Sequence, residues 1–173
     1  MLRILAFCGL VLTAHQASAV ERDAPFGSID GGTVSLSEWD GQPVLVVNTA
    51  SQCAFTKQYR ALQDLYDQYR DQGLVVLAVP SDDFRQELAT NAEVKEFCEL
   101  QYGIDMPMTV ITSVKGDGAH PFFRSVREET GFVPSWNFNK VLIGPDGSVV
   151  ETFGSTVRPL SQKMTREIEA LLD

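Results

Sequence analysis

The sequence predicts an α/β fold with a central mixed sheet flanked by helices, and three features carry this prediction. Residues 43–48 and 74–79 are almost continuously apolar, as is typical of strands buried on both faces of a sheet. Residues 54–72, between them, place apolar side chains at helical spacing, so the three segments form a right-handed strand–helix–strand unit with parallel strands. Farther along, two short apolar segments flank the turn sequence Gly-Pro-Asp-Gly at 144–147, which predicts an antiparallel hairpin.

The elements of the first half follow from turn-forming residues and from apolar periodicity. Glycines within 27–32 predict a turn, after which residues 33–36 form a short strand. A second turn at 39–43 leads into the first buried strand. The helix at 54–72 is amphipathic and is expected to stop at Gly73, because glycine readily adopts the left-handed conformation that ends helices.

The second half contains three predicted helices, at 92–101, 120–129 and 160–172. The first ends before Gly103, and the second begins at Pro121, a residue favoured at the first helical position. Short strands are predicted at 108–111 and, around the hairpin turn, at 141–143 and 149–153. The order of strand–helix–strand, helix, hairpin and helix is that of a thioredoxin-like α/β sandwich.

The first 19 residues are predicted to be a cleaved signal peptide, which leaves residues 20–173 as a single domain. Arg3 supplies a positive charge, residues 4–13 an apolar segment, and Ala17-Ser18-Ala19 the small residues at which signal peptidases cut. An uncleaved anchor is the less favoured alternative, because the apolar run is shorter than the roughly 18 residues that span a bilayer. The protein is therefore expected to be exported without a membrane anchor, to the periplasm if bacterial and otherwise as a secreted protein.

The composition excludes several classes of function. The formal net charge of the 173 residues is −9, or −10 once Arg3 is removed, and an acidic surface repels the phosphate backbone of nucleic acids. Three Cys and two His are too few for a zinc-ribbon site or a multi-disulfide scaffold. Cleavage after Ala19 retains Cys53, Cys98 and His120. Two cysteines in an oxidising compartment can form one static disulfide, so a reactive role for either must be weighed against that alternative.

Cys53 lies where the first buried strand gives way to the predicted helix. The free N–H groups and the positive dipole end of a helix N-terminus stabilise a thiolate, and Lys57 can add positive potential. Position alone supports a reactive thiol and a structural cysteine equally. Thr56 rules out the C-x-x-C motif of dithiol oxidoreductases, and Lys57 rules out the C-x-x-x-C motif of copper-delivery sites. A single nucleophile with a distant second thiol remains, which suits peroxide reduction through a sulfenic acid.

Five segments of the chain resemble, in order and spacing, motifs of the glutathione peroxidase family. They are VVNTASQCAFTKQYRALQDLYDQY, GLVVLAVPSDDFRQE, EFCELQYGIDMP, HPFFRSV and SWNFNKVLIGPDGSVVETF. The resemblance runs from about Phe26 to the end of the chain. It implies a Cys-based peroxidase that reduces hydrogen peroxide and organic hydroperoxides and needs no metal, haem or flavin.

The resemblance also implies the active-site residues. The nucleophile corresponds to Cys53, and the family's Trp and Asn correspond to Trp136 and Asn137, whose N–H groups can stabilise a thiolate and the departing oxygen. Asp83 stands where the family has Gln. A carboxylate donates no hydrogen bond and disfavours a neighbouring thiolate. Asp83 is therefore displaced, protonated, a proton acceptor for the thiol or simply a loop cap, with Arg85 available to neutralise it.

Cys98 matches the resolving cysteine of the family's two-cysteine branch, which implies a thioredoxin-like reductant, with glutathione as the second candidate. Because Cys98 lies in a predicted helix, its Cα atom is expected to be more than about 7 Å from that of Cys53, beyond disulfide reach, until the helix unwinds. The short segment before Trp136 implies a monomer. Two alternatives remain: a non-catalytic redox sensor or disulfide donor, and a structural domain with a static disulfide.

Overall fold

The computed structural model describes residues 20–172, so the predicted signal peptide, residues 1–19, lies outside the described part of the chain. The centre is a four-stranded sheet with the order β4-β3-β5-β6. Strand β3 (Val44–Thr49) runs parallel to β4 (Val75–Pro80) and antiparallel to β5 (Lys140–Ile143), which pairs with β6 (Val149–Phe153) as a hairpin. The predicted mixed sheet is confirmed.

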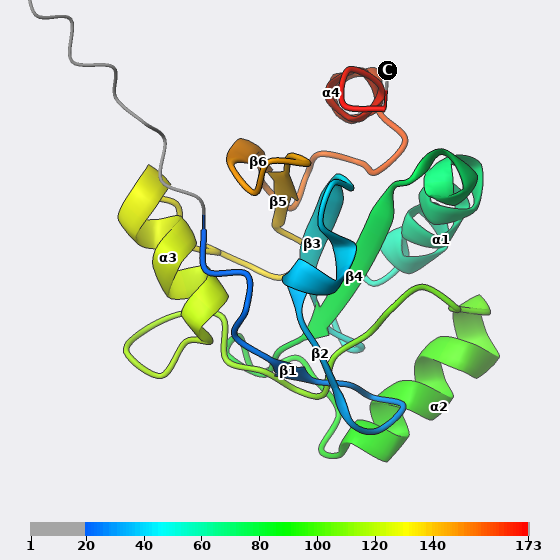
Figure 1. Ribbon diagram of the computed structural model, residues 1–173. Coiled ribbons are helices and arrows are strands. Elements are labelled where there is room, and N and C mark those ends of the chain that lie inside the picture. Colours follow the sequence, from blue (N-terminus) through cyan, green and yellow to red (C-terminus); the bar gives the residue numbers. More distant parts are fainter. Residues whose placement is uncertain (1–19, 173) are drawn as a thin grey trace, which may run out of the picture.

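Helices cover both faces of this sheet (Figure 1). Side chains that alternate along the strands divide the core into two clusters, one on each face. The first cluster includes residues of α1 (Gln58–Tyr69), α2 (Asn91–Tyr102) and α4 (Gln162–Glu169). The second includes residues of α3 (Pro121–Thr130) and of the N-terminal segment. The arrangement is a three-layer α/β fold in which the sheet is the middle layer.

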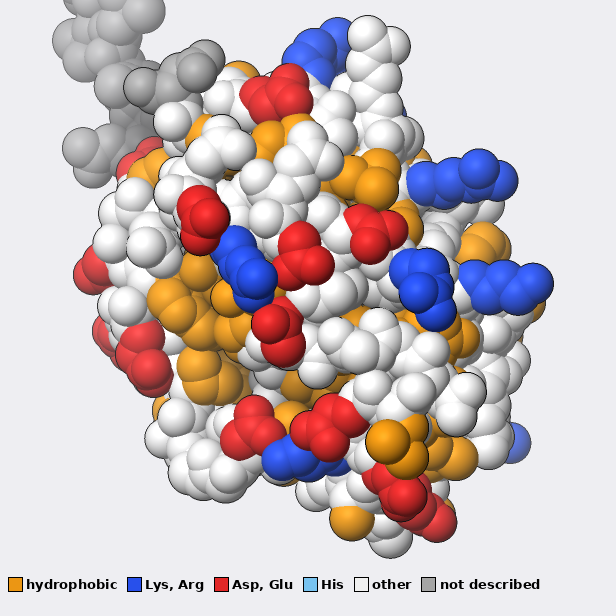
Figure 2. All heavy atoms as spheres, turned by 90° about the vertical axis from the view of Figure 1, so that its right-hand side faces the viewer, with side chains coloured by type: hydrophobic (Ala, Val, Ile, Leu, Met, Phe, Trp, Pro, Cys, Tyr) orange, Lys and Arg blue, Asp and Glu red, His pale blue; other side chains and the backbone are white. Residues whose placement is uncertain are grey.

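Shorter elements complete the described chain. They are the 3-10 helices η1 (Leu36–Trp39) and η2 (Arg70–Gln72) and the paired two-residue strands β1 (Phe26–Gly27) and β2 (Thr33–Val34). None of the helices within residues 20–172 combines the length and the apolar character that crossing a membrane requires. Acidic side chains spread over the face seen in Figure 2, with Lys and Arg mainly along its right-hand edge.

Four predicted elements differ from the structure. The strand predicted at 33–36 is limited to β2, because η1 already begins at Leu36. The helix predicted from residue 54 begins at Gln58, because the preceding residues form consecutive tight turns, the first closed by a hydrogen bond from Thr56 N to Cys53 O. The predicted strand at 108–111 is reduced to isolated bridges. The closing helix is shorter than predicted, spanning Gln162–Glu169.

Candidate active site

Cys53 occupies the turn between β3 and α1 rather than the first turn of the helix itself. Its side chain is almost fully buried, with 8% of its surface exposed. Its N–H donates to Thr56 Oγ1 at 3.0 Å, and the Thr56 hydroxyl also lies 2.9 Å from the carbonyl oxygen of Ala50. The N–H of Phe55 points at Cys53 Sγ at 3.4 Å. The turn therefore fixes the position of the Cys53 side chain and directs the N–H of Phe55 at its sulfur, an arrangement that can stabilise a thiolate.

Trp136 and Asn137 are fixed at the end of the strand that leads into this turn. Asn48, near the end of β3, donates from Nδ2 to the carbonyl oxygen of Trp136 at 3.0 Å and accepts the N–H of Asn139 at Oδ1, also at 3.0 Å. Asn137 is fully buried, whereas the Trp136 side chain is 41% exposed and its ring lies 5.4 Å from that of Phe84. The two sequence-predicted residues thus lie beside the C-terminal end of β3, the strand that leads into the Cys53 turn.

Gln86 joins Asn137 to the Cys53 turn, and sequence reasoning did not select it. Its side-chain Oε1 accepts a hydrogen bond from Asn137 Nδ2 at 3.0 Å, and its backbone carbonyl accepts the N–H of Gln52 at 2.9 Å. The next residue, Glu87, is buried and accepts the N–H of Ser51 at 3.0 Å, and burial raises the pKa of its carboxyl. Gln86 lies in the segment GLVVLAVPSDDFRQE that resembles a family motif, and this match is the signal that could have indicated it.

Asp83 faces a different part of the molecule. Its carboxylate accepts the N–H groups of Val114 and Lys115 at 2.7 and 3.1 Å, and the Ser113 hydroxyl lies 3.2 Å from it. The Lys115 ammonium lies 4.1 Å from the centre of the Phe84 ring. These contacts are those of a residue that caps a neighbouring loop, which is one of the four roles that the sequence left open for Asp83.

Cys98 is a second free thiol and lies on α2 with 1% of its surface exposed. Burial raises the pKa of the Cys98 thiol to about 12, so the thiol is protonated and unreactive while it remains in place. Cys53 is also free, and both residues belong to the same core cluster. The helix that carries Cys98 has well-defined ends, because Thr90 and Glu93 form a capping box and Gly103 ends it with φ 63°.

A buried lysine, Lys140, is hydrogen-bonded to the start of α1 and to the segment after β6. Lys140 on β5 is fully buried and donates to Gln58 Oε1 at 2.6 Å and to Val157 O at 2.7 Å. Gln58 Nε2 in turn donates to Ser155 O at 2.6 Å, and the Ser155 hydroxyl donates to Asn137 O at 2.7 Å. Burial lowers the pKa of Lys140 to about 7. The start of α1, the 155–157 segment and Asn137 are therefore held by one connected set of hydrogen bonds.

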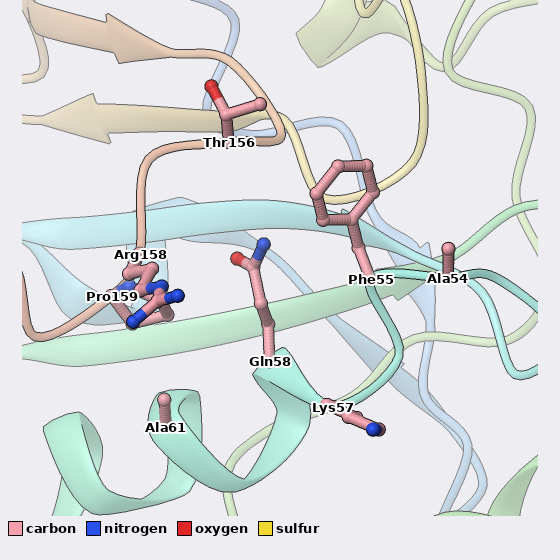
Figure 3. Close-up of a pocket in the computed structure, with 8 residues that line it drawn as sticks. All are labelled: Ala54, Phe55, Lys57, Gln58, Ala61, Thr156, Arg158 and Pro159. Atoms are coloured by element: carbon pink, nitrogen blue, oxygen red, sulfur yellow. The ribbon is translucent and has the colours of Figure 1, made fainter.

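A cavity of about 440 Å³ lies beside the Cys53 turn. Phe55 and Lys57 line it from the turn, Gln58 from the start of α1, and Arg158 from the segment after β6 (Figure 3). The Gln58 side chain extends from α1 toward the segment after β6, whereas the Lys57 side chain points away from that segment. Within residues 20–172, neither Lys57 nor Arg158 forms an ion pair, and no three His, Cys, Asp or Glu side chains cluster closely enough to share a metal ion.

Comparisons with known proteins show which family the chain resembles. The family model for glutathione peroxidase matches residues 23–127. A protein of Lactococcus lactis subsp. cremoris named glutathione peroxidase is 42% identical over 149 residues, which cover 83% of this chain and 94% of that protein. A Synechocystis protein named hydroperoxy fatty acid reductase is 38% identical over 156 residues, covering 84% of this chain and 91% of that protein.

The fold is also found among solved structures. A thioredoxin-family thiol:disulfide interchange protein from Chlorobium tepidum superposes with a TM-score of 0.69, covering 93% of this chain and all of that one. At 15% identity, this likeness confirms the predicted thioredoxin-like fold and nothing further. The family model and the curated relatives confirm the predicted enzyme class, a peroxidase. With its motifs, its fold and its relatives in agreement, the chain belongs to the glutathione peroxidase family.

Proposed function

We propose that the chain is an exported thiol peroxidase that reduces hydrogen peroxide and organic hydroperoxides at Cys53. The thiolate sulfur of Cys53 attacks the terminal oxygen of the peroxide, so that an S–O bond forms while the O–O bond breaks. The sulfur is oxidised to a sulfenic acid. The departing hydroxide or alkoxide takes up the proton that the thiol released and leaves as water or an alcohol.

The observation that supports this proposal best is the arrangement around the Cys53 turn. A backbone N–H is directed at the sulfur, and the Asn137 side chain is linked through Gln86 to the residue that precedes Cys53. A cysteine whose only role is core packing does not require hydrogen-bond donors directed at its sulfur. Hydrogen-bond donors fixed in advance are what the sulfur and the departing oxygen need as charge moves from one to the other. Trp136, the residue before Asn137, is 41% exposed, so a small peroxide can arrive from solvent on this side.

Cys98 is proposed to resolve the sulfenic acid. Its thiol attacks the Cys53 sulfur, a disulfide forms, and the sulfenic oxygen leaves as water with the thiol proton. Since burial keeps the pKa of Cys98 at about 12, this step requires α2 to open locally and expose the thiol. A thioredoxin-like protein then reduces the disulfide by exchange, with glutathione as the second candidate.

The substrate range and the cellular setting are part of the same proposal. Similarity to a protein named hydroperoxy fatty acid reductase supports the inclusion of organic hydroperoxides. The cavity beside the turn joins the apolar ring of Phe55 to the cation of Arg158, a combination that suits an amphiphilic anion. The enzyme is proposed to act as an exported monomer without metal, haem or flavin, and its reductant, a thioredoxin-like protein or glutathione, must then be present in the same compartment.

The decisive experiment measures consumption of hydrogen peroxide and of an organic hydroperoxide with either thioredoxin or glutathione as reductant. Replacing Cys53 with Ser should abolish consumption of both. Replacing Cys98 with Ser should leave the first, stoichiometric reaction intact and stop turnover with thioredoxin. Wild-type turnover by Cys53→Ser would refute the peroxidase proposal. A wild-type protein that forms mixed disulfides but consumes no peroxide would support the disulfide-donor alternative instead.

A further inference from the structure

Several buried oxygen atoms that form no hydrogen bond lie near the junction of β3, α1 and the loop after β4. Within residues 20–172, they are the side-chain atoms Thr49 Oγ1, Ser51 Oγ, Tyr59 Oη and Glu87 Oε2. The other carboxylate oxygen of Glu87 accepts the N–H of Ser51 at 3.0 Å. Thr49 and Glu87 both lie near enough to Tyr59 to affect the pKa of its phenol. Leaving a buried polar atom unpaired costs free energy, so a group of such atoms indicates a role other than packing.

The Cys98 thiol on α2 borders this group of oxygen atoms. Tyr59 is fully buried, and after burial itself Cys98 is the strongest cause that raises the pKa of the Tyr59 phenol. Burial raises the pKa of Cys98 to about 12, an effect that Tyr59 opposes and that Glu87 strengthens. Glu99 is the other carboxylate that raises the pKa of Cys98, but Glu99 is exposed. Of these two carboxylates, Glu87 is therefore the one that is shielded from solvent.

Glu87 is also fixed to the segment that leads to Cys53. Its Oε1 accepts the N–H of Ser51, two residues before Cys53, and the N–H of Leu88 at 2.8 Å. One carboxylate oxygen thus holds the group in place, while Oε2, which has no hydrogen bond within the described residues, can take up a proton. Because Cys53 is only 8% exposed, a thiol that attacks the Cys53 sulfur does so in a place largely closed to bulk water.

The surroundings of the Glu87 carboxyl suit it to act as a base. Burial raises its pKa above the ordinary 4.5, although the hydrogen bonds that its oxygens accept oppose this rise. A carboxylate with a raised pKa is a better proton acceptor at neutral pH than an exposed carboxylate. The titratable groups around it are Asp82 from its own loop, Tyr59 from α1 and Cys98 from α2.

We propose that Glu87 is the proton acceptor of the resolution step: its carboxylate takes the proton of the Cys98 thiol while that sulfur attacks the sulfenic acid of Cys53. The inference rests on the resolving role proposed for Cys98. The S–S bond forms as the S–O bond breaks, so the sulfur of Cys98 is oxidised and that of Cys53 is reduced. Glu87 then gives the proton to the departing hydroxide, which leaves as water. The carboxylate is thereby restored for the next cycle.

The test follows formation of the Cys53–Cys98 disulfide in single turnovers between about pH 5 and 9. One reaction starts from the sulfenic acid, made with one equivalent of hydrogen peroxide. The other starts from a mixed disulfide of Cys53 with thionitrobenzoate, from which Cys98 displaces a coloured thiolate. Glu87→Gln keeps an acceptor for the N–H of Ser51 but cannot take up a proton. Glu99→Gln is the matched control, because Glu99 also acts on Cys98 but is exposed.

The expected result is a change in the pH dependence as well as in the rate. In the wild type and in Glu99→Gln, the rate of disulfide formation should rise with pH and level off once Glu87 is ionised. At pH 7, Glu87→Gln should slow this step about tenfold or more relative to sulfenic acid formation by the same variant. Its rate should then keep rising up to about pH 9, as the thiol itself ionises. A purely structural role for Glu87 would lower the rate and leave the pH dependence unchanged.

The two starting states separate this inference from the proposed function. If the wild type forms no sulfenic acid but Glu87→Gln slows displacement of thionitrobenzoate, the peroxidase proposal fails and this inference stands. If sulfenic acid forms and Glu87→Gln keeps the wild-type rate and pH dependence, the inference is overturned and the peroxidase proposal stands. Should Glu87→Gln not fold, the wild type alone decides, because a rate that rises up to about pH 9 without levelling off would overturn the inference. Absence of the Cys53–Cys98 disulfide in both wild-type reactions would do the same.

Discussion

Replacing Lys140 with Met tests whether a buried, uncompensated ammonium group lies beneath the active site. Lys140 is fully buried, and within residues 20–172 it has no carboxylate partner, only the oxygens of Gln58 and Val157. An ammonium group in such a place is poorly solvated, and its pKa falls from the ordinary 10.5 to about 7. Methionine has a similar length and carries no charge, so Lys140→Met removes the ionisation and keeps most of the volume.

The expected effect follows from where the proton is bound. Between pH 7 and 10.5 the unfolded chain holds the Lys140 proton while the folded chain has released it, so the free energy of unfolding of the wild type rises with pH in this window. Below pH 7 both states hold the proton, and the full destabilisation of about 5 kcal/mol applies at about 1.4 kcal/mol per unit of pKa. Relative to Lys140→Met, the wild type should therefore gain up to about 2.7 kcal/mol between pH 7 and 9.

The assay is urea denaturation of both proteins at pH 6, 7, 8 and 9 in the presence of a thiol reductant. The quantity of interest is the difference in unfolding free energy between wild type and Lys140→Met, because other titrating groups contribute equally to both. Lys163→Met, on the exposed side of α4, is the matched control and should give a difference that does not change with pH. A flat difference for Lys140→Met as well would refute the claim that burial lowers the pKa of Lys140.

Two further predictions concern the loop that Asp83 caps and the helix that carries Cys98. Asp83→Ala should lower the free energy of unfolding by about 1–3 kcal/mol, because it leaves two N–H groups at 114–115 unpaired. The rate of the first reaction with peroxide should change less than threefold. A tenfold loss of this rate, measured against the exposed control Asp117→Ala, would show instead that the carboxylate takes part in the chemistry. Thr90→Ala removes the N-cap of α2 at a cost of about 1 kcal/mol and should speed formation of the Cys53–Cys98 disulfide about fivefold, as followed by mass spectrometry after one equivalent of peroxide. An unchanged rate would mean that opening of α2 does not limit resolution.

Much of the fold was predictable because buried strands and helices produce recognisable patterns of apolar residues in the sequence. The two continuously apolar segments became β3 and β4, and the turn at 144–147 joins β5 to β6 as predicted. The predicted first residue of α1 was wrong by about four residues. Apolar periodicity cannot reveal that the Thr56 side chain closes a tight turn with Cys53, since that contact depends on local hydrogen bonds rather than on burial.

The candidate active site likewise contains residues that the sequence identified and residues that it did not. Cys53, Trp136 and Asn137 were selected from motifs, and the structure places them near the C-terminal end of β3. Gln86 was not selected, because the motif comparison assigned the family's Gln to position 83, and the sequence alone does not report which side chain of the loop contacts Asn137. Lys140 was missed for a related reason: a single Lys in an apolar strand reads as a solvent-facing residue unless the α1 end and the 155–157 segment are known to cover it.

The proposed Cys53–Cys98 disulfide would change the surface of the protein at α2. Val94 and Cys98 are the fully buried residues of this helix, with Phe97 and Tyr102 partly buried against the same core cluster, so withdrawal of Cys98 into a disulfide would remove one of its two fully buried side chains. A helix that loses a fully buried side chain exchanges its amide hydrogens faster and is cut more readily by proteases. Reduced and oxidised molecules would then present different surfaces at α2, where Leu100 is already 72% exposed. A reducing partner that contacts this helix can therefore distinguish molecules that need electrons from those that do not.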